Sequence, residues 1–195
     1  PSFIQKLPFG IQKYKWYLAL MPKAVAALDL KKYDLIISDS SGFIKGVRKG
    51  KQALHICYIH TPIRYLTVDQ DYFRYTAPKI THFLIPLLFT YLKRKDLEGA
   101  KQPDYYIANS KTIAERVKIY YHREVDAIVF PPVDTSLFYR KKKEAVEDFF
   151  LVACRLVPYK RTDLAVEACN RLGKKLVVIG TGPDEEALKK IAFTS

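Results

Sequence analysis

The chain has 195 residues, of which 49% are hydrophobic, which is sufficient for one large or two small domains with a buried core. Its formal net charge of +13 indicates attraction to polyanions, namely nucleic acid, an anionic membrane surface or phosphorylated small molecules. The three cysteines show no Cys-x-x-Cys spacing, which argues against a disulfide framework or a zinc site and indicates a reducing compartment.

Both ends of the chain indicate that it is part of something longer. There is no initial methionine, because Met21 is the only one, and the last residues follow a helical pattern where an alternating α/β chain would supply another strand. We therefore expect an internal fragment that carries the end of one domain and the beginning of the next. No secretory signal is visible.

The first part of the chain predicts a helix and then two strands. Residues 10–29 have a helical pattern, which Pro22 kinks or divides into two pieces. Residues 34–38 and 53–59 are apolar runs typical of strands, and the second one leads into the sequence His-Thr-Pro-Ile-Arg-Tyr at 60–65. Because parallel strands end at the same edge of a sheet, both strands deliver polar loops to one rim.

His60 is the first candidate for chemistry. A histidine at the end of a strand, before a loop that Pro62 makes rigid, can present its imidazole to a cleft. There it can hydrogen-bond a ligand hydroxyl or transfer a proton. The alternative is a histidine packed in the turn and bonded to the backbone.

Two further stretches allow more than one interpretation. Asp69 and Asp71 form an Asp-x-Asp triplet, whose oxygens can ligate Mg²⁺ or Mn²⁺, although such a triplet often occurs by chance. Residues 80–92 are the most hydrophobic stretch, too short to span a bilayer and interrupted by Pro86. With the basic residues 93–95 behind it, this stretch predicts either a buried helix or a helix in a membrane interface.

The middle of the chain predicts a strand, a helix and a connector. A short strand within 103–108 ends at Asn109 and Ser110, and a helix follows from 111 to 121. Either residue is a good N-cap, which explains both without a function. Residues 126–130 predict the last strand of this half, and a stiff Pro-Pro-Val-Asp connector at 131–134 follows. The charged segment that comes next predicts a domain boundary.

Residues 149–183 predict one strand-helix-strand unit. Residues 149–153 form a continuous apolar run, the pattern of a strand buried on both faces. A helix with an apolar stripe ends at Gly173, and residues 176–179 make the second buried strand before a glycine-containing turn.

The first loop of this unit contains two cations. Arg155 lies at the carboxyl end of the strand and Lys160 at the start of the helix, so both lie at the sheet edge where α/β proteins bind ligands. Two cations beside helix-terminal N–H groups predict a phosphate or diphosphate site. The alternative is a solvated pair of loop residues.

Together these motifs resemble the family 4 type of GT-B glycosyltransferases, notably mannosyltransferases. The resemblance rests on the Arg-x4-Lys loop at 155–160, the His-Thr-Pro-x-Arg-Tyr run, the Lys-Asp-Leu at 95–97, the Ala-Asn-Ser at 108–110 and the Pro-Pro-Val-Asp element, in the order of the family. It implies an α/β fold of GT-B type, with two Rossmann-like domains and parallel sheets, both incomplete. Residues 1–139 would be the later part of the acceptor-side domain with its connector, and residues 140–195 the beginning of the nucleotide-sugar-binding domain.

The resemblance also implies an activity. Family members transfer a hexosyl group from a nucleotide-diphosphate sugar to an acceptor hydroxyl with retention of configuration, generally without a metal, and we expect no cofactor. It places the diphosphate on Arg155 and Lys160, and the reacting sugar near His60. Arg64, Ser110 and Gly182 become further ligand contacts. Because the Gly-rich loop of the first domain and the Glu-x7-Glu element of the second are absent from the chain, we expect these residues alone to be inactive.

The expected partners follow from the same resemblance. The donor is a nucleotide sugar, with GDP-mannose as the working choice, and the acceptor is a glycan or a lipid-linked glycan in polysaccharide synthesis. We expect a cytoplasmic protein with peripheral contact at the inner face of the cytoplasmic membrane. We expect no nucleic acid, because most Tyr and Phe residues fall on faces that the pattern assigns to the core.

Three alternatives remain open. A GT-B-shaped epimerase or phosphorylase would share the phosphate loop but not the His-Thr-Pro-x-Arg-Tyr run. A metal-dependent GT-A enzyme would use Asp69 and Asp71 and would lose activity in a chelator. A basic nucleic-acid-binding protein would show aromatic residues interleaved with arginine on one exposed surface and a steep salt dependence.

Overall fold

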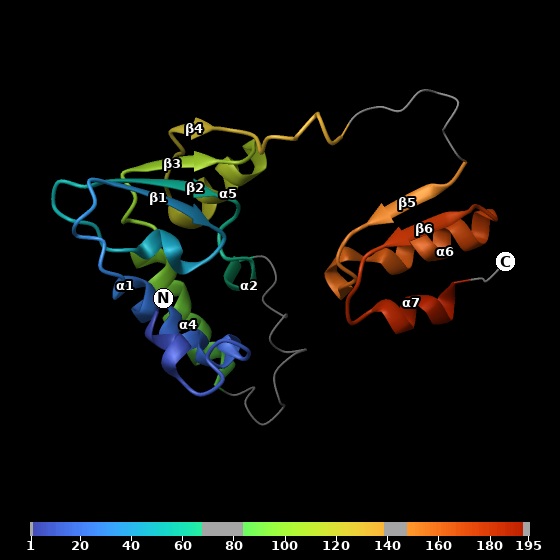
Figure 1. The fold of residues 1–195 in the computed structure, drawn as a ribbon, viewed down its shortest axis with the longest axis horizontal. Helices are drawn as coiled ribbons and strands as arrows, with labels where there is room; N and C mark the ends of the chain where they lie inside the picture. Colours follow the sequence, from blue (N-terminus) through green and yellow to red (C-terminus); the bar gives the residue numbers. More distant parts are fainter. Residues whose placement is uncertain (1, 68–83, 139–147, 193–195) are drawn as a thin grey trace. The chain divides into compact units, whose positions relative to one another are not determined.

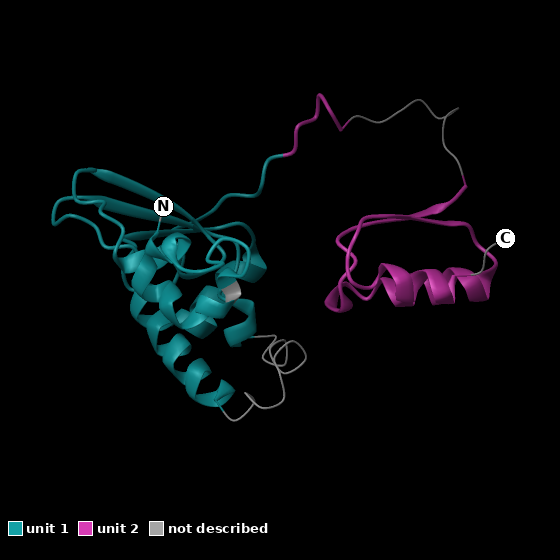
Figure 2. Ribbon diagram, turned by 60° about the horizontal axis from the view of Figure 1, so that its bottom comes forward, with its two compact units in different colours: residues 1–132 teal, residues 133–195 magenta. Residues whose placement is uncertain are grey.

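A computed structural model describes residues 2–67, 84–138 and 148–192. The chain divides into two compact units, residues 1–132 and residues 133–195 (Figure 2). The boundary predicted from the sequence, after residue 139, lies outside the described residues.

Unit 1 contains a parallel sheet with the strand order β1-β2-β3-β4 (Figure 1). The strands are β1 (Leu35–Ser40), β2 (Leu54–Ile59), β3 (Tyr105–Ala108) and β4 (Ala127–Ile128). Each strand pairs in parallel with the next one along the chain. Crossover connections between parallel strands are normally right-handed. In this strand order, such connections place the intervening helices on one face of the sheet. The predicted α/β architecture with parallel strands is therefore confirmed.

The helices of unit 1 come from the N-terminal segment and from the connections between strands. They are η1 (Phe3–Lys6), η2 (Tyr14–Leu20), α1 (Met21–Ala26), η3 (Phe43–Gly46), α2 (Arg64–Thr67), α4 (Ile85–Gly99) and α5 (Lys111–Tyr121). The predicted division near Pro22 is confirmed, because a 3-10 helix ends at Leu20 and α1 carries this proline in its first turn.

The apolar stretch predicted at 80–92 is helical from Ile85 onward, and its first residues lie outside the described part of the chain. Among the helices of the described ranges, none is long and apolar enough to cross a bilayer.

Two apolar clusters hold the helices against each other and against the sheet. The first lies where η2, η3, α2 and α4 meet, and the second lies between the sheet and α5. Their buried members are Leu18, Phe43, Ile63, Leu66, Phe89 and Leu92 in the first, and Cys57, Ile59, Tyr106, Ala108, Ile113 and Val117 in the second. Burial of this apolar surface is the main favourable contribution to folding of unit 1.

A buried ion pair joins η3 to α4. The Lys45 ammonium pairs with one carboxylate oxygen of Asp96, and the two side chains are 1% and 4% exposed. Lys45 also donates to the Gly42 carbonyl at 2.8 Å, and the Tyr121 hydroxyl donates to the second oxygen of Asp96 at 2.8 Å. Burial lowers the pKa of Lys45, and the nearby Asp96 carboxylate opposes that shift. Both charges therefore have close polar partners.

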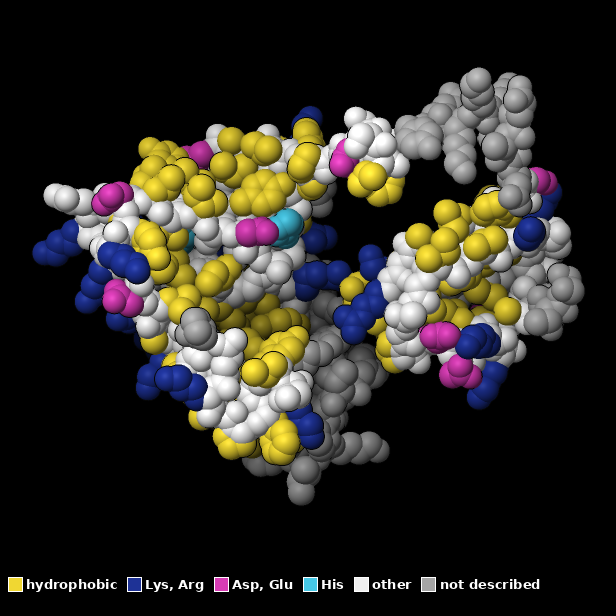
Figure 3. Space-filling model, viewed as in Figure 1, with side chains coloured by type: hydrophobic (Ala, Val, Ile, Leu, Met, Phe, Trp, Pro, Cys, Tyr) yellow, Lys and Arg dark blue, Asp and Glu magenta, His cyan; other side chains and the backbone are white. Residues whose placement is uncertain are grey.

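The other face of the sheet in unit 1 is exposed. Along β1 exposed and buried residues alternate, with Leu35 51% and Ile37 69% exposed, and Tyr105 on β3 is 47% exposed. Figure 3 shows hydrophobic side chains over the strands. The expectation that most Tyr and Phe residues are in the core is wrong for many of them, because one sheet face and the N-terminal segment leave rings such as those of Phe9 and Tyr14 in solvent.

Unit 2 contains a two-stranded parallel sheet, β5 (Phe150–Ala153) and β6 (Leu176–Ile179), with η6 (Pro158–Lys160), α6 (Thr162–Leu172) and α7 (Glu185–Ile191). The predicted strand-helix-strand order is confirmed, and Gly173 ends α6 in the left-handed conformation with φ of 58°.

The expected burial of the two strands on both faces is wrong. Phe150 is 56% exposed, Leu151 55% and Ile179 57%. Phe150 and Leu151 are adjacent in β5 and point to opposite faces, so neither face is fully covered. The physical reason is that in the described part of unit 2 the sheet has only two strands, both of them edges, and that α6 and α7 lie on one side of it (Figures 1 and 2).

Candidate functional site

His60 lies at the carboxyl edge of the sheet in unit 1. Its backbone N–H donates to the Ser40 carbonyl at 2.9 Å, which continues the pairing of β1 and β2 beyond the strand end. Its ring nitrogen Nε2 is hydrogen-bonded to the Asp39 carboxylate. The two side chains are 41% and 73% exposed. The ring is thus partly in solvent and bonded to a carboxylate, in contrast to the alternative of a packed ring bonded to the backbone.

Tyr58 is a second neighbour of this ring. Its ring meets that of His60 edge to face, with the centroids 5.2 Å apart and the planes at 88°. The Tyr58 hydroxyl donates to the Val129 carbonyl at 2.9 Å, which links the ring to the segment after β4. The Asp39 carboxylate and the Tyr58 ring together orient the imidazole of His60. In enzymes that use a nucleophile and a histidine base, a third side chain orients the histidine in the same way.

Sequence reasoning missed Asp39 as a partner of His60. The strand register places Asp39 opposite Tyr58, and His60 lies two residues farther along the same face of the sheet. The sequence contained a signal for this contact. Side chains alternate between the two faces along a strand, so Asp39 and His60, near the ends of neighbouring parallel strands, could have been assigned to the same face. The Asp-Ser sequence after the first strand was assigned to a loop instead.

Ser110 lies at the same edge and caps α5. Its hydroxyl oxygen accepts from the Ile113 N–H at 3.3 Å, so the predicted capping function is confirmed. The same hydroxyl donates to the Asn109 side-chain oxygen at 3.0 Å, and the Asn109 amide donates to the His60 carbonyl at 3.3 Å. The structure therefore brings His60 and Ser110 to one edge through Asn109. A ligand contact of Ser110 stays a prediction.

Arg64 is the first residue of α2, directly after Ile63, which is completely buried. The buried Ile63 anchors the start of α2, and the exposed Arg64 side chain therefore lies at the end of the loop that connects β2 to this helix. Its function as a ligand contact stays a prediction. The metal alternative at Asp69 and Asp71 lies outside the described residues.

Arg155 and Lys160 lie on the first loop of unit 2. Arg155 follows the end of β5 by two residues, and Lys160 is the last residue of η6. Both are exposed, and the Lys160 ammonium is 5.8 Å from the centroid of the Tyr159 ring. Within the described ranges neither side chain forms an ion pair, which is compatible with an anion site and with a solvated pair.

The start of α6 differs from the expectation. The helix begins at Thr162, two residues beyond Lys160, and its N-cap is Arg161 in the left-handed conformation with φ of 51°. The Arg161 guanidinium pairs with Asp163 at 2.8 Å in the first helical turn. The helix-terminal N–H groups therefore have a carboxylate close by, and Lys160 belongs to the preceding η6 and not to the first turn of α6.

Gly182 has a packing explanation. A Cβ atom at this position would lie 2.0 Å from the Leu156 carbonyl oxygen. The Leu156 N–H donates to the Thr181 carbonyl at 3.0 Å, so the loop after β6 lies directly on the loop that carries Arg155. Only glycine permits this approach. A ligand contact of Gly182 stays a prediction.

Among the described residues no group of three or more His, Cys, Asp or Glu side chains has an arrangement that could hold a metal ion. Comparison of the sequence with models of known protein families and with curated proteins gives no match.

Proposed function

We propose that the chain is part of a retaining hexosyltransferase of the GT-B family 4 type, which uses a nucleotide-diphosphate sugar as donor. The observation that carries the proposal is the pair of exposed cations, Arg155 and Lys160, on the loop after a parallel strand, with no carboxylate paired to either among the described residues. Such loops at the carboxyl ends of parallel strands are where α/β proteins bind phosphates.

The two cations would act on the leaving group. As the bond between the sugar and the diphosphate breaks, negative charge develops on the diphosphate oxygens. A guanidinium and an ammonium next to these oxygens stabilise that charge more than the charge of the bound ground state, which lowers the barrier. The bidentate geometry of Arg155 suits a phosphate, and Lys160 adds a mobile point charge.

The His60 cluster supports a site for sugar hydroxyls in unit 1. Because the Asp39 carboxylate holds Nε2 of His60, Nδ1 is the ring nitrogen that would meet a ligand. Because the ring is partly exposed at the carboxyl edge, it would position a hydroxyl of the donor or the acceptor. Asp39 would then be a positioning residue. Arg64 and Ser110 are proposed as further contacts in unit 1, and Gly182 as a further contact of the donor in unit 2.

Nucleotide-sugar binding to the chain tests the proposal. We expect GDP-mannose, the working choice of donor, or another nucleotide sugar from a screened panel, to bind weakly, with a dissociation constant on the order of 1 mM, which corresponds to a binding free energy of about 4 kcal/mol. Arg155→Ala and Lys160→Ala should each weaken binding roughly tenfold, the loss of one charge-assisted hydrogen bond.

Arg171→Ala is the matched control, because Arg171 is exposed in the last turn of α6, at the end of that helix remote from the loop, and its loss should leave the affinity unchanged. Isothermal titration measures all four proteins. Equal affinities of the parent chain and both loop variants would refute the diphosphate site. We expect no sugar transfer by these residues alone, so turnover in a product assay would contradict the fragment interpretation.

The partners follow from the proposal. The acceptor would be a glycan or a lipid-linked glycan in polysaccharide synthesis, with the protein in the cytoplasm and in peripheral contact with the membrane. The exposed Leu84 and Leu87, at 49% and 71%, beside the basic residues 93–95, support this contact. We propose no cofactor, no metal and no nucleic-acid partner.

A further inference from the structure

A pocket lies between α1, η3 and α4 in unit 1, away from the edge that carries His60. Its volume is about 330 Å³, within the size range of small-molecule sites. Its lining includes Arg48 and Gln102, which precede β2 and β3 in the chain and therefore lie toward the amino ends of those strands. The pocket is thus separate from the loops at the carboxyl edge.

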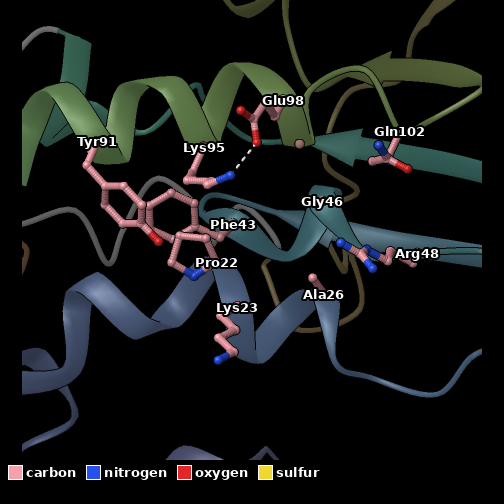
Figure 4. Close-up of a pocket in the computed structure, with 11 residues that line it drawn as sticks. Pro22, Lys23, Ala26, Phe43, Gly46, Arg48, Tyr91, Lys95, Glu98 and Gln102 are labelled. Atoms are coloured by element: carbon pink, nitrogen blue, oxygen red, sulfur yellow. Dashed lines mark hydrogen bonds and ion pairs between the residues drawn. The ribbon is translucent and has the colours of Figure 1, made fainter.

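The lining is divided into an apolar end and a polar end. Figure 4 shows the rings of Phe43 and Tyr91 together with Pro22 at one end, and Arg48 with Gln102 at the other. Lys95 extends from α4 between them. A ligand that fits this arrangement has a planar or apolar portion at one end and an anionic group at the other.

The charges of the pocket favour an anion. The lining carries three cationic side chains, Lys23, Arg48 and Lys95, and one carboxylate, Glu98. Glu98 accepts from Lys95 at 2.6 Å and also from Arg94, which is outside the lining, at 3.1 Å. These two cations lower the pKa of Glu98 and leave positive charge in excess around it.

Arg48 is the cation best placed for a ligand. Its side chain is exposed, points toward the pocket in Figure 4, and forms no ion pair with any residue in the described ranges. A guanidinium offers two parallel donors, the geometry that a phosphate group accepts. Lys23 extends away from the gap in Figure 4, so its contribution is a longer-range positive field.

Two glycines make the pocket rigid. Gly46 on η3 and Gly99 at the end of α4 line it, and a Cβ atom on either would lie 3.1 Å from the Cα of the other. This close crossing, together with the buried pair of Lys45 and Asp96 on the same two elements, fixes η3 against α4. The backbone that carries Lys95 and the element that precedes Arg48 are therefore fixed against each other before any ligand binds.

We propose that this pocket binds a phosphate monoester attached to an aromatic or lipid portion, with Arg48, Lys95 and Gln102 at the phosphate and Pro22, Phe43 and Tyr91 against the apolar portion. The proposal does not depend on the glycosyl-transfer activity, because none of these residues belongs to the donor site or to the His60 cluster.

Titration with phenyl phosphate tests the pocket, with inorganic phosphate and phenol as the two halves of that probe. We expect phenyl phosphate to bind more tightly than either half. Arg48→Gln and Tyr91→Ala should each weaken phenyl phosphate binding roughly fivefold, through loss of a charged contact and of an apolar contact respectively. Arg171→Gln on α6 is the control for a general loss of charge and should have no effect.

Arg155→Ala separates this proposal from the proposed function. If Arg155→Ala abolishes phenyl phosphate binding while Arg48→Gln leaves it intact, the anion is held by unit 2 and the pocket proposal is wrong. Equal affinity of Arg48→Gln and the parent chain also overturns it. Because both variants change exposed side chains, a circular dichroism spectrum equal to that of the parent confirms that folding is retained.

Vesicles distinguish the two sources of the phosphate monoester. Phosphatidylcholine vesicles with and without phosphatidic acid are sedimented with the protein. Binding that requires phosphatidic acid and is lost in Arg48→Gln assigns the pocket to a lipid headgroup. Phenyl phosphate binding without vesicle binding assigns it to a soluble phosphate monoester. Absence of both refutes the site.

Discussion

At the scale of single residues, charged and polar side chains inside unit 1 determine much of its specificity. Lys45 and Asp96 are nearly inaccessible, and each depends on the other and on neighbouring polar groups for compensation. Pairs of this kind contribute little net stability compared with apolar residues of similar size, but removal of one partner leaves a buried charge without its counterion.

Lys45→Met should therefore lower the free energy of unfolding by about 3–5 kcal/mol, because the buried Asp96 carboxylate loses its counterion. The double variant with Asp96→Leu should recover much of this loss. Urea unfolding of the two single variants and the double variant measures the coupling. Strictly additive effects would show that the pair does not act as a unit.

His55 makes the stability of unit 1 depend on pH. The residue is completely buried on β2, its Nε2 is 2.8 Å from the Ser38 hydroxyl, and its Nδ1 has no hydrogen-bond partner among the residues that the structure describes. Burial lowers the pKa of His55 below its usual value of about 6.5, an effect that Lys49 adds to and Asp104 opposes. The folded state thus binds fewer protons here than the unfolded state.

Because the pKa of His55 is lower in the folded state than in the unfolded state, the free energy of unfolding is highest above about pH 6.5, where His55 is neutral in both states. It decreases as the pH falls toward the pKa of the folded state. We expect the urea midpoint of the parent chain to decrease in that acidic window, and His55→Leu to show a flatter profile. His122→Gln, which removes an exposed histidine, should keep the slope of the parent. Identical slopes for all three proteins would contradict the assignment.

At the scale of elements, the helix boundaries follow from local signals. Ser110 begins α5 through its hydroxyl, His122 ends it in the left-handed conformation, and Gly173 ends α6 in the same way. The sequence predicted residues 111–121 as a helix because these cap signals are local and require no information about packing.

Ser110→Ala should cost about 1 kcal/mol of unfolding free energy, because the Ile113 N–H loses its acceptor at the start of α5. Ser110→Asp should retain most of the stability, since aspartate is an equally good N-cap. Thermal or urea unfolding gives both values. If Asp destabilises as much as Ala, the hydroxyl contributes through its bond to Asn109 and not through capping.

At the scale of the whole molecule, each unit is an α/β layer with a parallel sheet, and in both units apolar side chains of the described strands are exposed. Parallel sheets normally have helices on both faces, so exposed apolar side chains such as Ile37 and Phe150 mark surfaces on which another layer would pack. The net charge of +13 is also a property of the whole chain, because the electric field that it produces attracts any phosphorylated ligand of either unit.

The sequence by itself determined the order of strands and helices, the two-piece helix near Pro22, the cap of α5 and the strand-helix-strand order of unit 2. These features depend on periodicity and on backbone preferences that act over a few residues. Only the tertiary structure decided that Asp39 bonds His60, that β5 is exposed, and that Arg48, Lys95 and Tyr91 line one pocket. Such contacts join residues far apart in the chain. The period of two shows which residues of a strand share a face, but strand register and packing decide which of them meet, and these depend on the whole fold.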